Sequence, residues 1–346
     1  MTTRQQVALV RVLAFYLTAL VLLLFAGGAL QYSLGLTGVV LSQLLIFVAL
    51  PIVFTLAVEK RPLRPFLRLR MLSPGGFGRA VLLGVVGWLA AQLMGAVLVL
   101  LVQRLGGEMP QTYQILLDAG SWLALLVGAL VPAICEELSF RGYVLGALRT
   151  LGPTAAVVLT GLLFGALHLS IVRLIPLTLL GMLWALAVQR SGSILPGMIM
   201  HLINNGIALL LTFFVQDQAT PAELQGLEML PDTAVWTSMV MLTLMAAGLS
   251  AVAYFLAAGF SPRHLARPAE FEVELDWQAE GQTEQGPHLE SLAFEGDAEL
   301  QRLAGELAVL RLRRRRLLSA ASWLTGGLTL GIYLWAAMQE LAMVFG

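Results

Sequence analysis

Charge, cysteine and histidine are scarce in this sequence. Charged residues make up 12% of its 346 positions, against about 25% in soluble globular proteins, while hydrophobic residues make up 58% and the mean hydropathy is +0.83. The single cysteine, Cys135, excludes an internal disulfide framework and a cysteine-based zinc cluster. Basic and acidic residues cancel at 21 each, so no positive excess points to nucleic acid as a partner. The composition predicts an integral membrane protein.

Long apolar stretches recur along the chain. A helix needs about 20 apolar residues to cross a bilayer. Stretches of about that length lie at 8–30, 37–58, 80–103, 121–148, 152–170, 174–190, 193–215, 234–259 and 318–344. We therefore expect an all-α fold, a polytopic transmembrane helix bundle of about nine spans. Eight spans would form the core, and the ninth would be an additional C-terminal helix.

The basic residues are concentrated in a few connections between the spans. Cytoplasmic loops of membrane proteins are enriched in Lys and Arg, which predicts a cytoplasmic N-terminus and an outer C-terminus. The apolar run at 8–30 lacks a small-residue cleavage site, so we expect a retained span and not a cleaved signal peptide. We expect a bacterial plasma membrane. The residues on which this topology depends are Lys60, Arg61, Arg64, Arg68, Arg70 and Arg79 between the second and third spans, and Arg313 to Arg316 before the last.

An acidic segment divides the chain near its C-terminus. Residues 270–299 hold ten Asp and Glu but no Lys or Arg, a composition typical of a solvated, disordered linker. Such a segment could bind a protein partner. The sequence thus predicts a helix bundle at 1–259 with its motif core at about 80–215. A cytoplasmic acidic linker with a basic amphipathic end follows at 260–317, and an additional transmembrane helix at 318–346.

Two adjacent carboxylates, Glu136 and Glu137, interrupt one of the apolar stretches. An ionisable group at membrane depth costs roughly 2.5 to 3.5 kcal/mol, so it needs a compensating structure and a use. Residues four apart share a helical face, which places Glu137 beside Arg141 and predicts an ion pair. Glu136 points about 100° away from Glu137. Glu136 is therefore expected to be the freer carboxylate.

Histidine marks two further positions at membrane depth. Of four histidines, only His168 and His201 lie within predicted spans, and His201 shares a helical face with Asn205. At about 1.5 Å per residue, Glu136, His168 and His201 lie roughly 16 to 24 Å from the inner ends of their spans. We expect these groups to meet near the middle of the bilayer, in a solvated cavity that opens to one side.

Such a set of groups suits water activation and hydrolysis. Glu136 could act as a general base, a histidine could hold the water or donate a proton, and Asn205 could donate to an oxyanion. No activated nucleophile stands out, since Ser139 is best explained as a helix hydroxyl bonded to its own backbone. Two histidines and a carboxylate (Glu136, His168 and His201) could also bind a divalent metal such as zinc. No H-E-x-x-H motif is present, however, and we expect no cofactor to be required.

Three motifs in order carry a family resemblance. They are Glu136-Glu137-x-x-x-Arg141, Phe164-x-x-x-His168 and His201-x-x-x-Asn205. Each is weak alone, but together they resemble the CPBP family of intramembrane proteases, which holds the type 2 CAAX prenyl proteases and the bacteriocin-processing enzymes formerly called ABI. The resemblance covers about 80–215 well, the flanking spans loosely, and the acidic linker and last span not at all.

The resemblance implies an intramembrane glutamic endopeptidase, or a metalloprotease if a metal is bound. It implies that Glu136 and His168 activate water and that His201 and Asn205 stabilise the oxyanion. The expected substrate is a membrane peptide or a lipidated protein in the bilayer. Prenylated C-terminal peptides are suggested by the family name, with leader peptides or other membrane segments as the alternative.

The resemblance also implies supporting residues. Glu137 and Arg141 would brace the site, and Phe164 would pack against it. Two other classes of function stay open: a proton-coupled transporter, which also uses Glu, His and Arg inside the membrane, and a catalytically inactive scaffold. The clustering of the polar groups on only three spans, without internal repeats, favours the protease.

Overall fold

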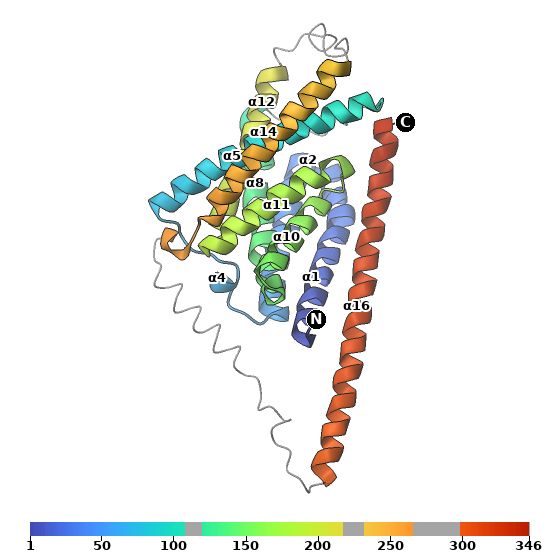
Figure 1. The fold of residues 1–346 in the computed structure, drawn as a ribbon. Coiled ribbons are helices and arrows are strands. Elements are labelled where there is room, and N and C mark those ends of the chain that lie inside the picture. Colours follow the sequence, from blue (N-terminus) through green and yellow to red (C-terminus); the bar gives the residue numbers. More distant parts are fainter. Residues whose placement is uncertain (108–119, 217–231, 266–297, 346) are drawn as a thin grey trace.

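The structure is a computed structural model that describes residues 1–107, 120–216, 232–265 and 298–345. Helices make up 90% of it, and long helices packed side by side form its body (Figure 1). In the described ranges no strand forms, and a single antiparallel bridge joins Leu72 to Leu265. The predicted all-α, polytopic helix bundle is confirmed.

The first helical unit folds back on itself at a glycine. Gly35 has φ +55° and ψ −130°, which is not helical. A side-chain carbon at Gly38 would clash with the carbonyl of Leu30, so the two arms run very close together at the turn. At the other end an Arg11–Glu59 ion pair of 2.8 Å joins them. The unit comprises α1 (Thr3–Leu22), η1 (Leu23–Gly27), α2 (Gly28–Gln43), η2 (Leu44–Ala49), α3 (Leu50–Val53) and η3 (Phe54–Val58).

The remaining helices form the rest of the bundle. They are α4 (Leu63–Phe66), α5 (Pro74–Arg104), α7 (Ser121–Leu125), η4 (Leu126–Leu130), α8 (Val131–Glu137), η5 (Leu138–Val144), α9 (Leu145–Leu148), η6 (Arg149–Leu151), α10 (Pro153–Leu167), α11 (Ile171–Ser191), α12 (Leu195–Gln216), α14 (Asp232–Ala258), η7 (Pro262–His264) and α16 (Ala298–Phe345). The segments from α7 to η6 make one helical rod with π-helical turns at η4 and η5.

Seven of the described helices are long and apolar enough to cross a membrane. The nine predicted stretches nevertheless all fall on helix. The difference arises because the folded unit Thr3–Val58 holds two of them, and because α10 has only 15 residues. At 1.5 Å per residue α10 is about 22 Å long, shorter than the hydrocarbon core of a bilayer. A helix this short does not cross the whole hydrocarbon core, and His168 lies at its C-terminal end.

Glycine sets the spacing between α10 and α11. A side-chain carbon at Gly181 would lie 2.9 Å from the Cα of Gly161, and one at Gly165 would clash with Thr178. Small residues at facing positions let membrane helices approach closely. The close crossing places Phe164 of α10 against Trp184 of α11, with ring centroids 5.6 Å apart.

The last helix is continuous across the boundary predicted at 317/318. α16 runs unbroken from Ala298 to Phe345, so the helical end of the predicted linker and the predicted last span are one element. It packs along α1, and its N-terminal part extends beyond the bundle (Figure 1). The acidic segment predicted at 270–299 lies outside the described residues except for its last two positions, so its disorder and its partner stay predictions.

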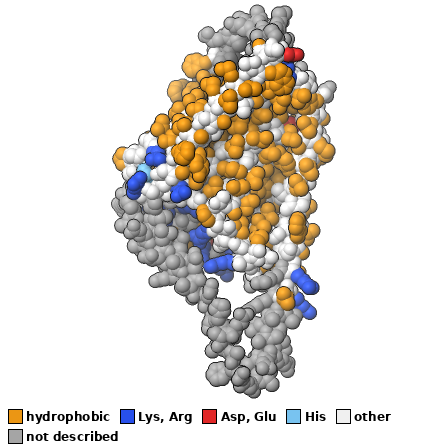
Figure 2. Space-filling model, in the orientation of Figure 1, with side chains coloured by type: hydrophobic (Ala, Val, Ile, Leu, Met, Phe, Trp, Pro, Cys, Tyr) orange, Lys and Arg blue, Asp and Glu red, His pale blue; other side chains and the backbone are white. Residues whose placement is uncertain are grey.

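The surface is apolar over most of its area. Figure 2 shows hydrophobic side chains across the face drawn, with Lys and Arg gathered toward the lower end. Large apolar side chains lie open on several helices, among them Phe255 (72% exposed), Leu244 (67%) and Trp323 (80%). A soluble protein rarely exposes so large an apolar area. The chain is an integral membrane protein.

Candidate active site

A buried carboxylate on α8 forms the centre of the site. The Oε1 atom of Glu137 lies 2.7 Å from Nη1 of Arg141 and 3.0 Å from Nδ1 of His201. The side chains of Glu137 and Arg141 are fully buried, and that of His201 is 3% exposed. The pairing predicted from the four-residue spacing of Glu137 and Arg141 is present. The contact between Glu137 and His201 joins α8 to α12, and no sequence spacing predicted it.

Aromatic rings and a carbonyl hold the guanidinium of Arg141. Its Nη2 donates to the main-chain oxygen of Gly181 at 3.1 Å. Its Cζ lies 4.3 Å from the ring centroid of Phe164 and 5.0 Å from that of Trp184. A desolvated cation over an aromatic face gains about 2 kcal/mol. Phe164 thus contacts the predicted brace directly, and Trp184 shares that position with it.

Two arginines in the connection between α4 and α5 donate hydrogen bonds to backbone carbonyls near this ion pair. Nη1 of Arg68 donates to the main-chain oxygen of Arg141 at 3.1 Å, and Nη1 of Arg70 donates to that of Gly192 at 2.8 Å. Burial and the neighbouring guanidinium groups of Arg149 and Arg70 lower the pKa of Arg68 to about 10. Arg68 therefore stays cationic at neutral pH and keeps this hydrogen bond.

Glu136 points away from the brace. One of its carboxylate oxygens accepts from Nε2 of Gln43 on α2 at 3.1 Å, and the other has no hydrogen-bond partner among the described residues. The residue is 8% exposed. A buried carboxylate oxygen without a donor is costly, which makes it a candidate for a proton or a water molecule. Glu136 is the freer of the two carboxylates, as helical geometry predicted.

His168 ends α10 and is exposed at that position. Its Nδ1 lies 3.0 Å from the carbonyl oxygen of Phe164. A carbonyl can only accept, so Nδ1 carries the proton and Nε2 of the neutral ring is left with its lone pair. Glu136 and His201 are the groups of the predicted site within electrostatic range of His168. By the same reasoning Glu137 fixes the proton of His201 on Nδ1.

Asn205 lies one turn beyond His201 on α12 and already uses part of its amide. Its Nδ2 donates to the carbonyl of Gly128 in η4 at 3.1 Å, and its Oδ1 accepts from Nδ2 of Asn204 at 3.0 Å. One N–H of the Asn205 amide remains for another acceptor. His201 and Asn205 therefore have different partners. His201 bonds to Glu137 on α8, and Asn205 bonds to Gly128 in η4.

Three residues at the site were missed by sequence reasoning. Gln43 donates to Glu136, Trp184 lies 4.7 Å from the ring of His201, and Gly197 presses on Glu137. Gln43 could have been found, because it is a polar side chain inside the apolar stretch 37–58. Trp184 and Gly197 carry no comparable signal, since both residue types are common in membrane helices.

The predicted hydrogen-bond partner of the Ser139 hydroxyl was wrong. Its hydroxyl donates to the carbonyl of Phe47 on η2 at 3.2 Å and not to its own helix. A π-helical turn begins at the residue before Ser139 and alters the usual backbone register, and the neighbouring helix supplies the acceptor. Ser139 is fully buried and its hydroxyl proton is used by this carbonyl, which assigns it a packing role. Cys135 is buried and unpaired, as a core residue would be.

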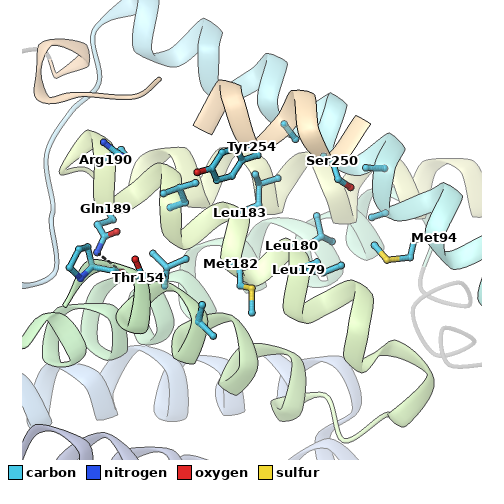
Figure 3. A pocket seen from close by; sticks show the side chains of 18 residues that line it. Met94, Thr154, Leu179, Leu180, Met182, Leu183, Gln189, Arg190, Ser250 and Tyr254 are labelled. Atoms are coloured by element: carbon cyan, nitrogen blue, oxygen red, sulfur yellow. Dashed lines mark hydrogen bonds between the residues drawn. The ribbon is translucent and has the colours of Figure 1, made fainter. Parts of the chain in front are cut away.

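A large apolar cavity lies elsewhere in the bundle. It measures about 720 Å³ and is bounded by α5, α10, α11 and α14 (Figure 3). Leu180 and Leu183 face it, whereas Gly181 and Trp184 on the same helix contact Arg141. None of the predicted site residues lines this cavity. The cavity and the polar site therefore lie on opposite faces of α11.

The fold and the site together define a class: a polytopic membrane protein with an acid–base cluster inside its helix bundle. Residues 118–207 match the family model described as type II CAAX prenyl endopeptidase, Rce1-like. The matched segment holds all three motifs, and the resemblance to the CPBP and CAAX protease family is confirmed. The comparisons with curated proteins and with solved structures each gave no match. The similarity covers this segment, which is about a quarter of the chain.

Gly197 gives a direct test of the brace. A side-chain carbon there would clash with Oε2 of Glu137, so Gly197→Ala should displace the carboxylate and lower the melting temperature of the purified protein. Gly206→Ala on the same helix is the matched control, because nothing lies within 4 Å of the added carbon. It should leave the melting temperature unchanged or slightly raised. Equal melting temperatures for the two variants would contradict this packing.

Proposed function

We propose that this protein is an intramembrane endopeptidase that hydrolyses a peptide bond of a membrane-associated or lipidated substrate. The observation that carries the proposal is the division of labour between adjacent carboxylates. Glu137 binds the cationic Arg141 and His201 through Oε1, whereas Glu136 accepts one hydrogen bond, from the neutral amide of Gln43. In each carboxylate the second oxygen has no partner among the described residues. The match of residues 118–207 to a protease family supports the same conclusion.

In the proposed reaction a water molecule attacks the carbonyl carbon of the scissile bond. Glu136 takes a proton from this water, while Nε2 of His168 accepts its second hydrogen bond and orients it. The carbonyl oxygen gains the negative charge. When the tetrahedral intermediate collapses, the C–N bond breaks and the proton on Glu136 passes to the leaving nitrogen. The products are a new carboxylic acid, which loses its remaining proton to solvent, and a new amine.

The oxyanion is assigned to α12. Asn205 retains one amide N–H for the developing charge. His201 can donate from Nε2 only when both ring nitrogens are protonated, because Nδ1 already donates to Glu137. The hydrogen bond to Glu137 holds the ring of His201 in place for that contact. Glu137 thus supports the oxyanion through His201 as well as anchoring Arg141.

We propose that this chemistry requires no metal. Among the residues that the structure describes, no group of three or more His, Cys, Asp or Glu side chains is arranged to hold a metal ion. Both site histidines do present Nε2, as zinc ligands do, so Glu136, His168 and His201 are the residues that would hold one. Metal removal decides between the two mechanisms.

Prolonged dialysis against a chelator should leave the cleavage rate within about twofold of the untreated protein. Metal-free buffer and readdition of zinc should not change it further. Elemental analysis of the active sample would show less than one equivalent of transition metal. Loss of activity that zinc restores would contradict the metal-free mechanism and assign Glu136, His168 and His201 as ligands.

The cellular substrate can be found by comparison of membrane proteomes. Cells that produce the Glu136→Ala variant should accumulate uncut membrane proteins or lipidated peptides that wild-type cells process. The new C-termini that cleavage creates in wild-type cells should be absent from the variant cells. We propose that the cut sites lie on the cytoplasmic side, because the basic residues between 60 and 79 predict that the inner ends of the helices lie there. Identical termini in both strains would contradict a protease function.

A further inference from the structure

A carboxylate from the last helix reaches into the bundle beside the site. Glu340 of α16 accepts hydrogen bonds from the hydroxyl of Ser170 and from the main-chain N–H groups of Ile171 and Val172. The residue is 9% exposed. It is the sole charged residue between 317 and 345 of the sequence. A charge at this depth needs a structural reason.

These contacts form the N-terminal cap of α11. The first N–H groups of a helix have no partner within it, and here two of them donate to Glu340 while that of Arg173 donates to Ser170 at 3.1 Å. A carboxylate at this end also interacts favourably with the helix dipole. The start of α11 is therefore held by another helix, one that lies far along the chain and outside the matched segment.

The capped turn adjoins His168 directly. Only Leu169 separates His168 from Ser170, and its φ of +50° is unfavourable for a branched side chain. Such conformations persist where the surroundings fix them, and cost on the order of 1–3 kcal/mol. Tyr333, two turns before Glu340 on α16, places its hydroxyl 3.5 Å from the carbonyl oxygen of Ser170. Glu340 and Tyr333 of α16 thus both contact Ser170, the residue that follows the strained Leu169.

We propose that Glu340 is a positioning residue for the proposed hydrolysis. By capping α11 it fixes the turn at 168–170 and so orients the imidazole of His168 toward Glu136. The additional C-terminal helix is then part of the working enzyme and not an appendage to it. The inference rests on the proposed role of His168 as a water-orienting group.

The test uses the full-length protein in liposomes. The probes are a farnesylated peptide ending in a Cys-aliphatic-aliphatic-X sequence and a single-span membrane peptide, and kinetics are measured on whichever is cut. Glu340→Ala should lower kcat at least about tenfold with KM within twofold, because a displacement of about 1 Å can cost two orders of magnitude. Glu340→Gln, which keeps one acceptor oxygen, should fall between Ala and wild type.

Gln339→Ala is the matched control, since Gln339 is the exposed neighbour of Glu340 on the same helix. It should behave as wild type. Amide hydrogen exchange at 168–173 should accelerate in Glu340→Ala while the other helices keep wild-type protection. Accelerated exchange throughout the bundle would instead assign Glu340 a purely structural role, and unchanged kcat would refute the positioning role.

Glu136→Gln in the same assay separates this inference from the function on which it rests. An inactive Glu136→Gln with fully active Glu340 variants would overturn the positioning role alone. A fully active Glu136→Gln would overturn the proposed function, whatever the Glu340 variants do. Reduced kcat in Glu340→Ala with partial recovery in Glu340→Gln supports the inference.

Discussion

Substitution of Glu136 by Gln is expected to lower the rate of peptide cleavage by about 10²- to 10⁴-fold, the contribution usual for a positioned general base. The amide keeps the size of the side chain and its contact with Gln43, so the protein should still fold. The measurement is the single-turnover rate in liposomes. The melting temperature of the same sample shows whether folding is retained.

His168→Ala should have a comparable effect on the same rate, because the water would lose its second hydrogen-bond partner. His264→Ala is the matched control, since His264 lies in η7 and the hydrogen bonds of its ring are to the nearby Ser261. It should leave the rate unchanged. Wild-type turnover in Glu136→Gln or His168→Ala would rule out the mechanism proposed here.

Glu137→Gln is expected to destabilise the fold as well as slow the reaction. Removal of one partner from a buried ion pair costs about 3 to 5 kcal/mol, because the other charge is left uncompensated. Here the stranded charge is Arg141, which is fully buried. We expect a large drop in melting temperature in detergent, accompanied by loss of activity as His201 loses its acceptor.

A second ion pair in the chain provides the control. Arg11 and Glu59 also lie 2.8 Å apart, but the side chain of Arg11 is 38% exposed. Partly exposed pairs contribute about 1 kcal/mol or less, so Glu59→Gln should lower the melting temperature only slightly. If Glu137→Gln were as stable as Glu59→Gln, the buried brace would not be the structural centre of the site.

Local spacing predicted those parts of the fold and site that depend on one helix. Hydropathy located the long helices of the bundle, since burial in lipid requires a long apolar run. The four-residue interval between Glu137 and Arg141 predicted their contact, and the 100° rotation predicted that Glu136 would be left apart. The last two predictions follow from helix geometry alone.

Contacts between distant helices were beyond such reasoning. The bond from His201 to Glu137 joins residues 64 positions apart, and it depends on the close approach that Gly197 permits. Gln43 reaches Glu136 only because the first helical unit reverses at Gly35. No periodicity reports how helices cross, so these partners emerge from packing. The roles assigned to the site residues stay predictions until rates are measured.

The domain boundaries illustrate the same limit. Composition separated an acidic linker from a last span at 317/318, but helical hydrogen bonding does not follow hydropathy, and α16 continues through that point. A role for Glu340 could have been predicted, because it is the one charged residue between 317 and 345 of the sequence. Its partners, Ser170 and the start of α11, could not.

The most direct test of the central claim is cleavage of a defined peptide by the purified protein in liposomes prepared in ¹⁸O-labelled water. We predict two fragments, with one ¹⁸O atom in the new C-terminal carboxylate after a single turnover, and no product from Glu136→Gln. No fragment from a correctly folded wild-type protein, on either the farnesylated or the single-span peptide, would contradict the account. Uptake of a solute by the same liposomes would then favour a transporter.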